Sequence, residues 1–114
     1  MSWENSIKEF KYYLKVERSL ADNSVNAYIR DIRKLADFCF KIKVDELNIS
    51  VNEIREFIAD LNSKNISARS QARIISGVKA FFKYLIIEDY LTNDPTMLIE
   101  NPKNYFYLIG KLDH

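Results

Sequence analysis

Apolar residues recur every three or four positions along most of this chain, which is the period of an α-helix and not of a β-strand. The first apolar stripe consists of Trp3, Ile7, Phe10 and Leu14. Only 2 Gly and 2 Pro occur among 114 residues, so few positions force a helix to break. The pattern therefore predicts an all-α fold, whose first helix covers roughly residues 3 to 17.

The second and third helices are predicted from similar stripes and from residues that cap helix N-termini. The second helix begins at Asp22, a predicted N-cap, and extends to about residue 41. Its apolar stripe consists of Val25, Tyr28, Ile32, Leu35 and Cys39. The third helix begins with a capping box, in which Ser50 and Glu53 bond to each other's backbone amides. Residues 42 to 51 alternate only weakly and include acids, so they are predicted to form a loop.

The fourth helix is predicted over residues 66 to 86, with Ser67 as its N-cap. Its core face is expected to hold Ile75, Val78, Phe82 and Leu85. Asp94, followed by Pro95 at the first helical position, predicts a short C-terminal helix through Glu100. The expected architecture is a compact bundle of four main helices plus this short helix.

Chain length and the single cysteine limit the class of protein. A chain of 114 residues is the size of one domain and can bury a core without metals or disulfides. Cys39 is the only cysteine, which excludes an internal disulfide and a Cys-based zinc site and indicates a reducing, cytoplasmic setting. Because it lies on the stripe of the second helix, we expect a buried, unreactive thiol. Neither a signal peptide nor a membrane-spanning segment is predicted.

One face of the predicted fourth helix is basic and otherwise built of small residues. At 100° per residue this face, opposite the core face, presents Arg69, Arg73, Ser76, Gly77, Ala80 and Lys83. No acid occurs between residues 61 and 87. Small residues between cations let a nucleic-acid backbone approach closely, and serine hydroxyls bond to phosphate. We expect Arg69 and Arg73 to be exposed, so that changing them to glutamate leaves the core intact.

The predicted second helix repeats this arrangement on the side away from its apolar stripe. Its basic, polar line consists of Asn23, Ala27, Arg30 and Lys34, and Lys41 continues it. Two such faces in one small domain favour a surface that lies along a DNA duplex. The formal net charge is only +1, so this hypothesis depends on where the charges lie.

The residues alone also allow these two faces a role without DNA. Charged helix exteriors are commonly solvated, and small residues equally mark a helix–helix contact within the fold or a dimer. A helical protein-interaction module without a DNA role is therefore the alternative function. An independent enzyme is the third hypothesis, but Glu53, Glu56 and Asp60 have the regular spacing of a solvated helix face. Phe81 and Tyr84 are expected to pack and not to stack on bases, with Tyr84 on the side of the fourth helix away from its core face.

Two segments resemble a known family. The segment ERSLADNSVNAYIRDIRKLADF, residues 17 to 38, is similar to the opening of the N-terminal core-binding domain of tyrosine recombinases of the Xer and phage-integrase type. The segment SARSQARIISGVKAFFKYLIIEDYLTNDPTMLIENPK, residues 67 to 103, is similar to the fourth helix and exit of that domain. The resemblance spans about residues 3 to 103 and has the expected order and spacing.

The resemblance implies a helical, SAM-like domain that forms half of a clamp around double-stranded DNA. Its second and fourth helices face the major groove, and other recombinase protomers on the DNA are further partners. The contact candidates are Asn23, Ser24, Arg30, Lys34, Ser67, Arg69, Ser70 and Arg73, with Lys83 added from the basic face of the fourth helix. No metal, cofactor or small-molecule substrate is implied.

In this family the chemistry belongs to a second domain, which supplies a tyrosine nucleophile and the groups around the scissile phosphate. We expect that domain to be absent from this chain and none of the seven tyrosines to be a nucleophile. Residues 1–103 are predicted to form the core-binding domain. Residues 104–114 are aromatic and apolar where the family continues into a polar linker, so they are treated as a tail of unclear origin.

Overall fold

The computed structural model describes residues 2–99 of the chain. Its helices are α1 (Trp3–Tyr12), the π-helical turn η1 (Tyr13–Glu17), α2 (Asp22–Lys41), α3 (Val51–Ser63) and α4 (Ala68–Ile87). Within residues 2–99 no strand is present, so the predicted all-α class with four main helices is confirmed.

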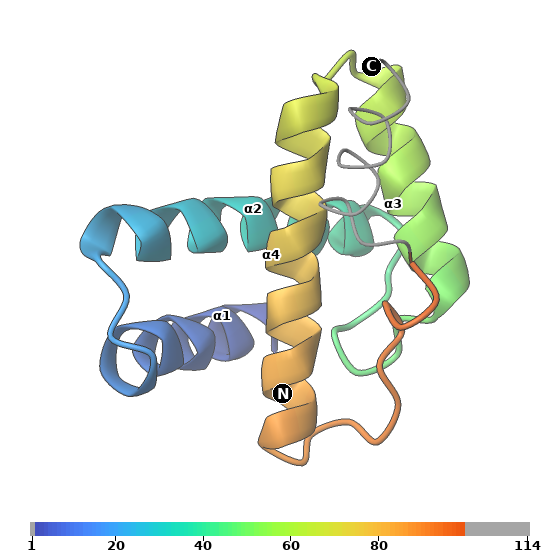
Figure 1. Cartoon of the computed structure of the whole chain (residues 1–114). Helices are drawn as coiled ribbons and strands as arrows, with labels where there is room; N and C mark the ends of the chain where they lie inside the picture. The colour runs from blue at the N-terminus through green and yellow to red at the C-terminus, as the bar shows by residue number, and fades with distance from the viewer. Residues whose placement is uncertain (1, 100–114) are drawn as a thin grey trace.

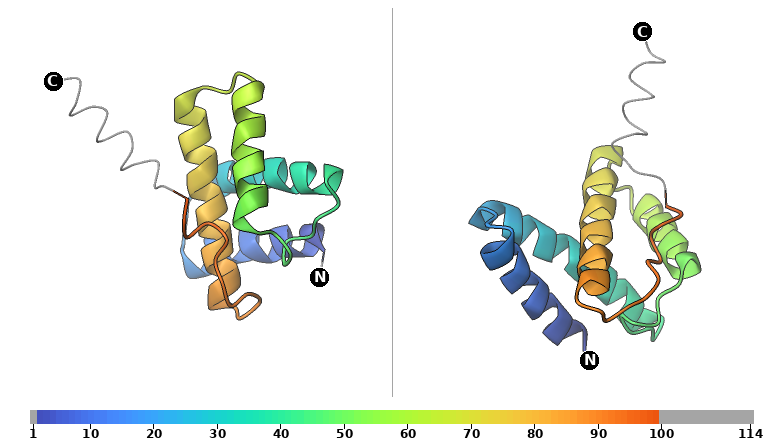
Figure 2. Two further views of the ribbon diagram at one scale, coloured as in Figure 1. Left: turned by 90° about the vertical axis from the view of Figure 1, so that its right-hand side faces the viewer. Right: turned by 60° about the horizontal axis from the view of Figure 1, so that its bottom comes forward.

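The helices form two antiparallel pairs that cross each other (Figure 1). α1 and α2 lie side by side, and α3 and α4 form the second pair, joined by a short turn. The views in Figure 2 show α4 running across the first pair while α3 flanks it. α4 is therefore the central helix, since it packs against α2 on one side and α3 on another.

The predicted first helix changes its geometry before it ends. From Tyr13 the backbone forms a π turn, in which the Arg18 N–H donates to the Tyr13 carbonyl at 3.1 Å. Ser19 follows with a φ of 52°, a left-handed conformation that ends the helix. The apolar stripe predicted the extent of this segment, but not the change in its hydrogen bonding.

The predicted caps are correct at two of three helix starts. The Glu53 carboxylate accepts from the Ser50 N–H at 2.9 Å and completes the capping box of α3. The Ser67 hydroxyl caps α4 by accepting from the Ser70 N–H at 3.2 Å. The prediction for Asp22 is wrong, because Ala21 occupies the N-cap position of α2 and Asp22 is the first helical residue.

The core face of α4 is wider than predicted and rotated relative to the prediction. Ile74 is buried, whereas Ile75, which was assigned to the core, is only half-buried. Gly77 and Tyr84, which were assigned to the opposite side, are also buried. The physical reason is that α4 lies between the other helices, so a single solvent-facing half does not exist.

Two predictions about packing are confirmed. Cys39 is fully buried, and burial raises the pKa of its thiol to about 12. Trp3 is partly buried and packs against the core, where its ring stacks on Phe81 at a centroid distance of 5.8 Å. Among residues 2–99, no helix is both long and apolar enough to cross a membrane.

The predicted short C-terminal helix does not form within the described residues. Asp94 begins a series of turns, and its carboxylate accepts from the Thr96 N–H at 2.8 Å. The backbone bonds that follow span three residues, as from the Met97 N–H to the Asp94 carbonyl, and are not continued into an α-helix. Glu100 and the tail 104–114 lie outside the described residues.

Candidate nucleic-acid interface

The candidate interface is built around the point where α2 crosses α4. A Cβ atom added to Gly77 would lie 3.5 Å from the Cβ atom of Asp31 and 3.5 Å from Cδ1 of Tyr28. These are ordinary contact distances, so the glycine lies against α2 and does not face solvent. Gly77 therefore belongs to a helix–helix contact within the fold, which is the alternative role for the small residues on α4.

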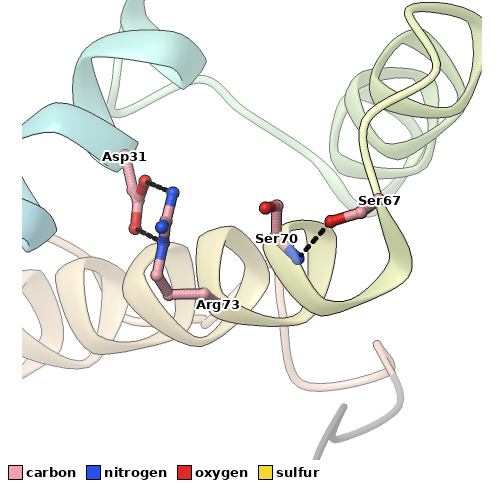
Figure 3. A network of polar contacts seen from close by, with 4 residues as sticks. All are labelled: Asp31, Ser67, Ser70 and Arg73. Atoms are coloured by element: carbon pink, nitrogen blue, oxygen red, sulfur yellow. Dashed lines mark hydrogen bonds and ion pairs between the residues drawn. The ribbon is translucent and has the colours of Figure 1, made fainter.

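An ion pair joins the two helices at the same crossing. Nε of Arg73 donates to Oδ2 of Asp31 at 3.1 Å, and Nη2 donates to Oδ1 at 3.0 Å. Figure 3 shows the guanidinium facing the carboxylate edge to edge. The Asp31 side chain is 2% exposed and that of Arg73 is 47% exposed. The expectation that Arg73 can be reversed in charge without harm to the core is therefore wrong, because glutamate there would face a buried carboxylate.

A surface pocket of about 210 Å³ opens beside this ion pair. It is lined by Ser24, Ala27, Tyr28 and Asp31 of α2 and by Arg73 and Ser76 of α4. The structure thus brings Ser24 and Arg73 together, although they lie far apart in the sequence. Ala27 and Ser76 are short side chains, so a partner can approach the guanidinium from the pocket.

The start of α4 carries three further candidates. Ser67 and Ser70 are joined by the capping bond, shown at the helix start in Figure 3. Arg69 is exposed at the same turn. A helix N-terminus carries partial positive charge and unpaired N–H groups, and an arginine beside it adds to the attraction for anions.

The remaining candidates lie apart from the pocket. Asn23 and Arg30 are exposed on α2. Lys34 lines a different depression of about 410 Å³, between α2 and α3, together with Lys41 and other residues. Lys83 is exposed on α4, about 15 Å along the helix axis from Arg73 at 1.5 Å per residue. Within residues 2–99, no contact brings Lys83 to the pocket.

Acids from other parts of the chain lie close to residues 61 to 87, although that segment itself contains none. Asp31 approaches α4 from α2, and Asp60 pairs with Lys64 at 3.0 Å. In the part of the chain that the structure describes, Arg30, Arg69 and Lys83 have no carboxylate within ion-pair distance. The basic face therefore consists of a few exposed cations around one paired arginine.

Asp31 is the functional candidate of this region that the sequence patterns did not identify. A signal was present, because Asp31 lies three residues after Tyr28 and four before Leu35, inside the apolar stripe of the second helix. Carboxylates are rarely fully buried without a partner. An acid on a core-facing stripe therefore indicates a cationic partner from another helix, and α4 supplies it as Arg73.

The tyrosines that the structure describes are placed for packing. Tyr84 lies against Tyr13 at a ring-centroid distance of 4.9 Å. Burial, and to a smaller extent the negative charge of nearby Glu9, raises the pKa of Tyr84 to about 12. Tyr28 contacts Phe10 edge to face at 6.3 Å. Residues 2–99 contain no group of three side chains suited to bind a metal ion.

Comparison with known proteins gives consistent matches over nearly the whole chain. The sequence model of the family described as "Phage integrase, N-terminal SAM-like domain" matches residues 7–89. Tyrosine recombinase XerC of Leptospira interrogans is 35% identical over 103 residues, which cover 90% of this chain and 33% of that protein. Tyrosine recombinase XerD of Staphylococcus haemolyticus is 34% identical over 101 residues, covering 88% of this chain and 34% of that protein.

XerD of Staphylococcus aureus is 33% identical over 101 residues, with the same coverage of 88% and 34%. This chain therefore spans about a third of the length of the relatives it matches. No solved structure gives a significant match.

Proposed function

This chain belongs to the family of phage-integrase N-terminal SAM-like domains, and we propose that it is the DNA-binding domain of a site-specific tyrosine recombinase. In this proposal α2 and α4 hold one side of a DNA duplex. A catalytic domain outside these 114 residues breaks and rejoins the DNA, so this chain alone is not an enzyme. Its protein partners are other protomers bound to the same DNA. We also predict a cytoplasmic location.

The observation that carries the proposal is that candidates from two separate helices line one surface pocket. Ser24 and Arg73 were singled out from different parts of the sequence, and both face the same space of about 210 Å³. Serine hydroxyls and guanidinium groups are common donors to DNA phosphate oxygens. The short side chains of Ala27 and Ser76 leave room for a backbone to approach these donors.

The distribution of charge on α2 and α4 outside the pocket supports the same proposal. Arg30 on α2 and Arg69 on α4 are exposed, and neither has a carboxylate within ion-pair distance among residues 2–99. Arg69 also lies in the first turn of α4, where the backbone attracts anions. Cations contributed by both helices are what a surface that follows a sugar–phosphate backbone requires.

The proposal is tested by reversing one cation on each helix. The variants are Arg30→Glu, Arg69→Glu and their combination, and Arg55→Glu on α3 is the control, since it makes the same charge change at an exposed position outside the surface. Binding to a fluorescent duplex is measured by anisotropy over a range of salt concentrations. For the parent we expect a nonspecific Kd on the order of 10⁻⁴ to 10⁻⁶ M at physiological salt.

The two predicted outcomes are distinct. Each lost phosphate contact should reduce the slope of log K against log salt by about 0.9, and the double variant should lose measurable binding. The control should bind like the parent apart from a small effect of net charge. Equal weakening by Arg55→Glu and by Arg69→Glu would mean that binding follows net charge alone, and the proposed face would be wrong.

Contact with another protein is a second candidate, favoured by an exposed apolar group at the end of α2. The Phe40 side chain is 82% exposed, and Ile42 and Leu47 nearby in the sequence are each 37% exposed. Exposed aromatic residues of this kind are enriched in protein interfaces. Phe40→Ser should leave duplex binding unchanged if this region contacts protein and not DNA.

A further inference from the structure

We propose that Asp31 is a positioning residue, which holds the guanidinium of Arg73 so that its outer edge meets two acceptor atoms of the DNA. This inference rests on the proposed function and adds a residue that does not itself touch DNA. It starts from the ion pair between α2 and α4, in which a buried carboxylate holds a half-exposed arginine.

The geometry divides the guanidinium into a used edge and an open edge. Asp31 occupies the edge formed by Nε and Nη2, at 3.1 and 3.0 Å. Within residues 2–99, no hydrogen bond is recorded for Nη1 of Arg73, and Nη2 carries a second hydrogen. The Asp31 side chain is 2% exposed and that of Arg73 is 47% exposed, so the arginine keeps solvent-accessible surface that the carboxylate does not cover. The edge of Nη1 and Nη2 is therefore the part of the guanidinium left for a ligand, and Arg73 lines the pocket.

The carboxylate itself has little freedom to move. Asp31 lies in the middle of α2, and its Cβ atom is 3.5 Å from the place where a Cβ atom at Gly77 of α4 would lie. Both of its oxygens accept from Arg73. The guanidinium is therefore ordered before any ligand arrives, and less side-chain entropy is lost when it forms further hydrogen bonds. Arg69, which has no such partner among residues 2–99, lacks this advantage.

Positioning and charge make opposite predictions for Asp31, which is what allows a clean test. Asp31 is negative, so on charge alone its removal should strengthen the binding of a polyanion. If Asp31 acts by positioning Arg73, its removal should weaken binding, despite the gain of positive charge. Asparagine has nearly the same shape as aspartate but removes the charge and one of the two acceptor oxygens.

The open edge of Arg73 presents two parallel N–H donors, so its ligand must offer two adjacent acceptors. Two DNA groups do so: a pair of phosphate oxygens, and the O6 and N7 atoms of guanine in the major groove. The two sources differ in measurable ways. Loss of a phosphate contact weakens binding to all sequences and lowers the salt slope by about 0.9, whereas loss of a guanine contact weakens binding to one sequence and relaxes specificity there.

The experiment compares Asp31→Asn with Glu56→Gln, an exposed position on α3 at which the same unit of negative charge is removed. Duplex affinity is measured at low salt, on a series of duplexes that differ by single base pairs, and thermal unfolding is measured in parallel. We expect Asp31→Asn to bind about two- to tenfold more weakly than the parent, the range that loss of one pre-ordered side chain implies. Glu56→Gln should bind as tightly as the parent or slightly more tightly.

A second pair of variants keeps the test decisive if Asp31→Asn is poorly folded. Arg73→Lys keeps the positive charge and a partner for Asp31, but loses the planar fork. It should weaken binding by a similar factor, whereas the matched change Arg55→Lys, at an exposed position on α3 outside the proposed surface, should not. Unfolding curves show that each comparison is made between folded proteins.

The results separate this inference from the proposed function. If the parent binds duplex DNA but Asp31→Asn binds as tightly as Glu56→Gln, and Arg73→Lys binds like Arg55→Lys, the positioning role is wrong and the DNA-binding role stands. If the parent and Arg69→Glu show the same negligible binding at low salt, the proposed function itself is wrong. Weakening by Asp31→Asn in an Arg73→Ala background would also overturn the inference, because Asp31 would then act without the arginine.

Discussion

Replacing Arg73 with alanine is expected to destabilise the fold, whereas the same change at Arg69 is not. Both arginines are exposed residues on the same face of α4, four positions apart. They differ in their partners, because Arg73 gives two hydrogen bonds to Asp31, while Arg69 has no carboxylate partner among residues 2–99. Arg73→Ala leaves a carboxylate that is 2% exposed without either bond.

The size of the effect follows from the burial of the two side chains. Breaking a fully buried ion pair by removing one partner costs about 3–5 kcal/mol. The Arg73 side chain is 47% exposed, so water can reach part of the carboxylate once the arginine is removed. We therefore expect Arg73→Ala to lower the free energy of unfolding by about 2–3 kcal/mol, which is less than for most fully buried pairs. For a domain of this size, this corresponds to a fall in Tm of about 8–20 °C.

Urea and thermal unfolding followed by circular dichroism measure this difference. Arg69→Ala should change the free energy of unfolding by less than about 0.5 kcal/mol, as is usual for surface positions. The double variant Asp31→Leu with Arg73→Met should recover much of the loss, because an apolar pair of similar size replaces a buried ion pair with little cost. Equal losses for Arg73→Ala and Arg69→Ala, in proteins with parent-like helicity, would refute the role of this ion pair in stability.

Four other outcomes are expected. Gly77→Ala should raise the free energy of unfolding by up to about 1 kcal/mol in urea titrations, because the added Cβ atom would lie at an ordinary contact distance of 3.5 Å from its neighbours and alanine favours the helix. A marked fall in the free energy of unfolding would show that the added Cβ atom does not fit. Because burial raises the pKa of Cys39 to about 12, its thiol should react with iodoacetamide at pH 8 only in denaturant. The chain alone should neither nick nor join supercoiled DNA on gels, and a covalent product lost on mutation of one tyrosine would contradict this. Residues 1–103 are proposed to form the domain, so deleting 104–114 should leave the Tm nearly unchanged.

The helices could be predicted from the sequence because the features that specify them are local. The stripe that begins at Ile7 and the capping box of Ser50 and Glu53 act over single helical turns. The Ser67 cap is equally local, so all three can be identified from the sequence without knowledge of the tertiary arrangement. The same locality explains the error at Asp22, since its preference for N-terminal positions is met in the first turn as well as at the cap.

Features that depend on the arrangement of helices could not be predicted from one helix at a time. The positions of Gly77 and Tyr84 on α4 were assigned to the side opposite the core face because the periodicity of a lone helix implies one buried face. A central helix between two neighbours buries more of its circumference. The prediction of a C-terminal helix after Asp94 was wrong for a related reason. A cap and a proline favour the start of a helix, but the residues that follow must also be stabilised in it by packing.

The pairing of Asp31 with Arg73 changes how the basic face should be understood. The absence of acids between residues 61 and 87 predicts a basic face on the fourth helix, but the fold places a carboxylate from α2 against the middle of it. With a formal net charge of +1, this chain has little long-range attraction for a polyanion. A small number of cations in fixed positions must then provide most of its affinity. Asp31 lowers the positive charge of such a surface, which weakens its nonspecific attraction for DNA. It also orders Arg73, which allows the arginine to form a directed pair of hydrogen bonds.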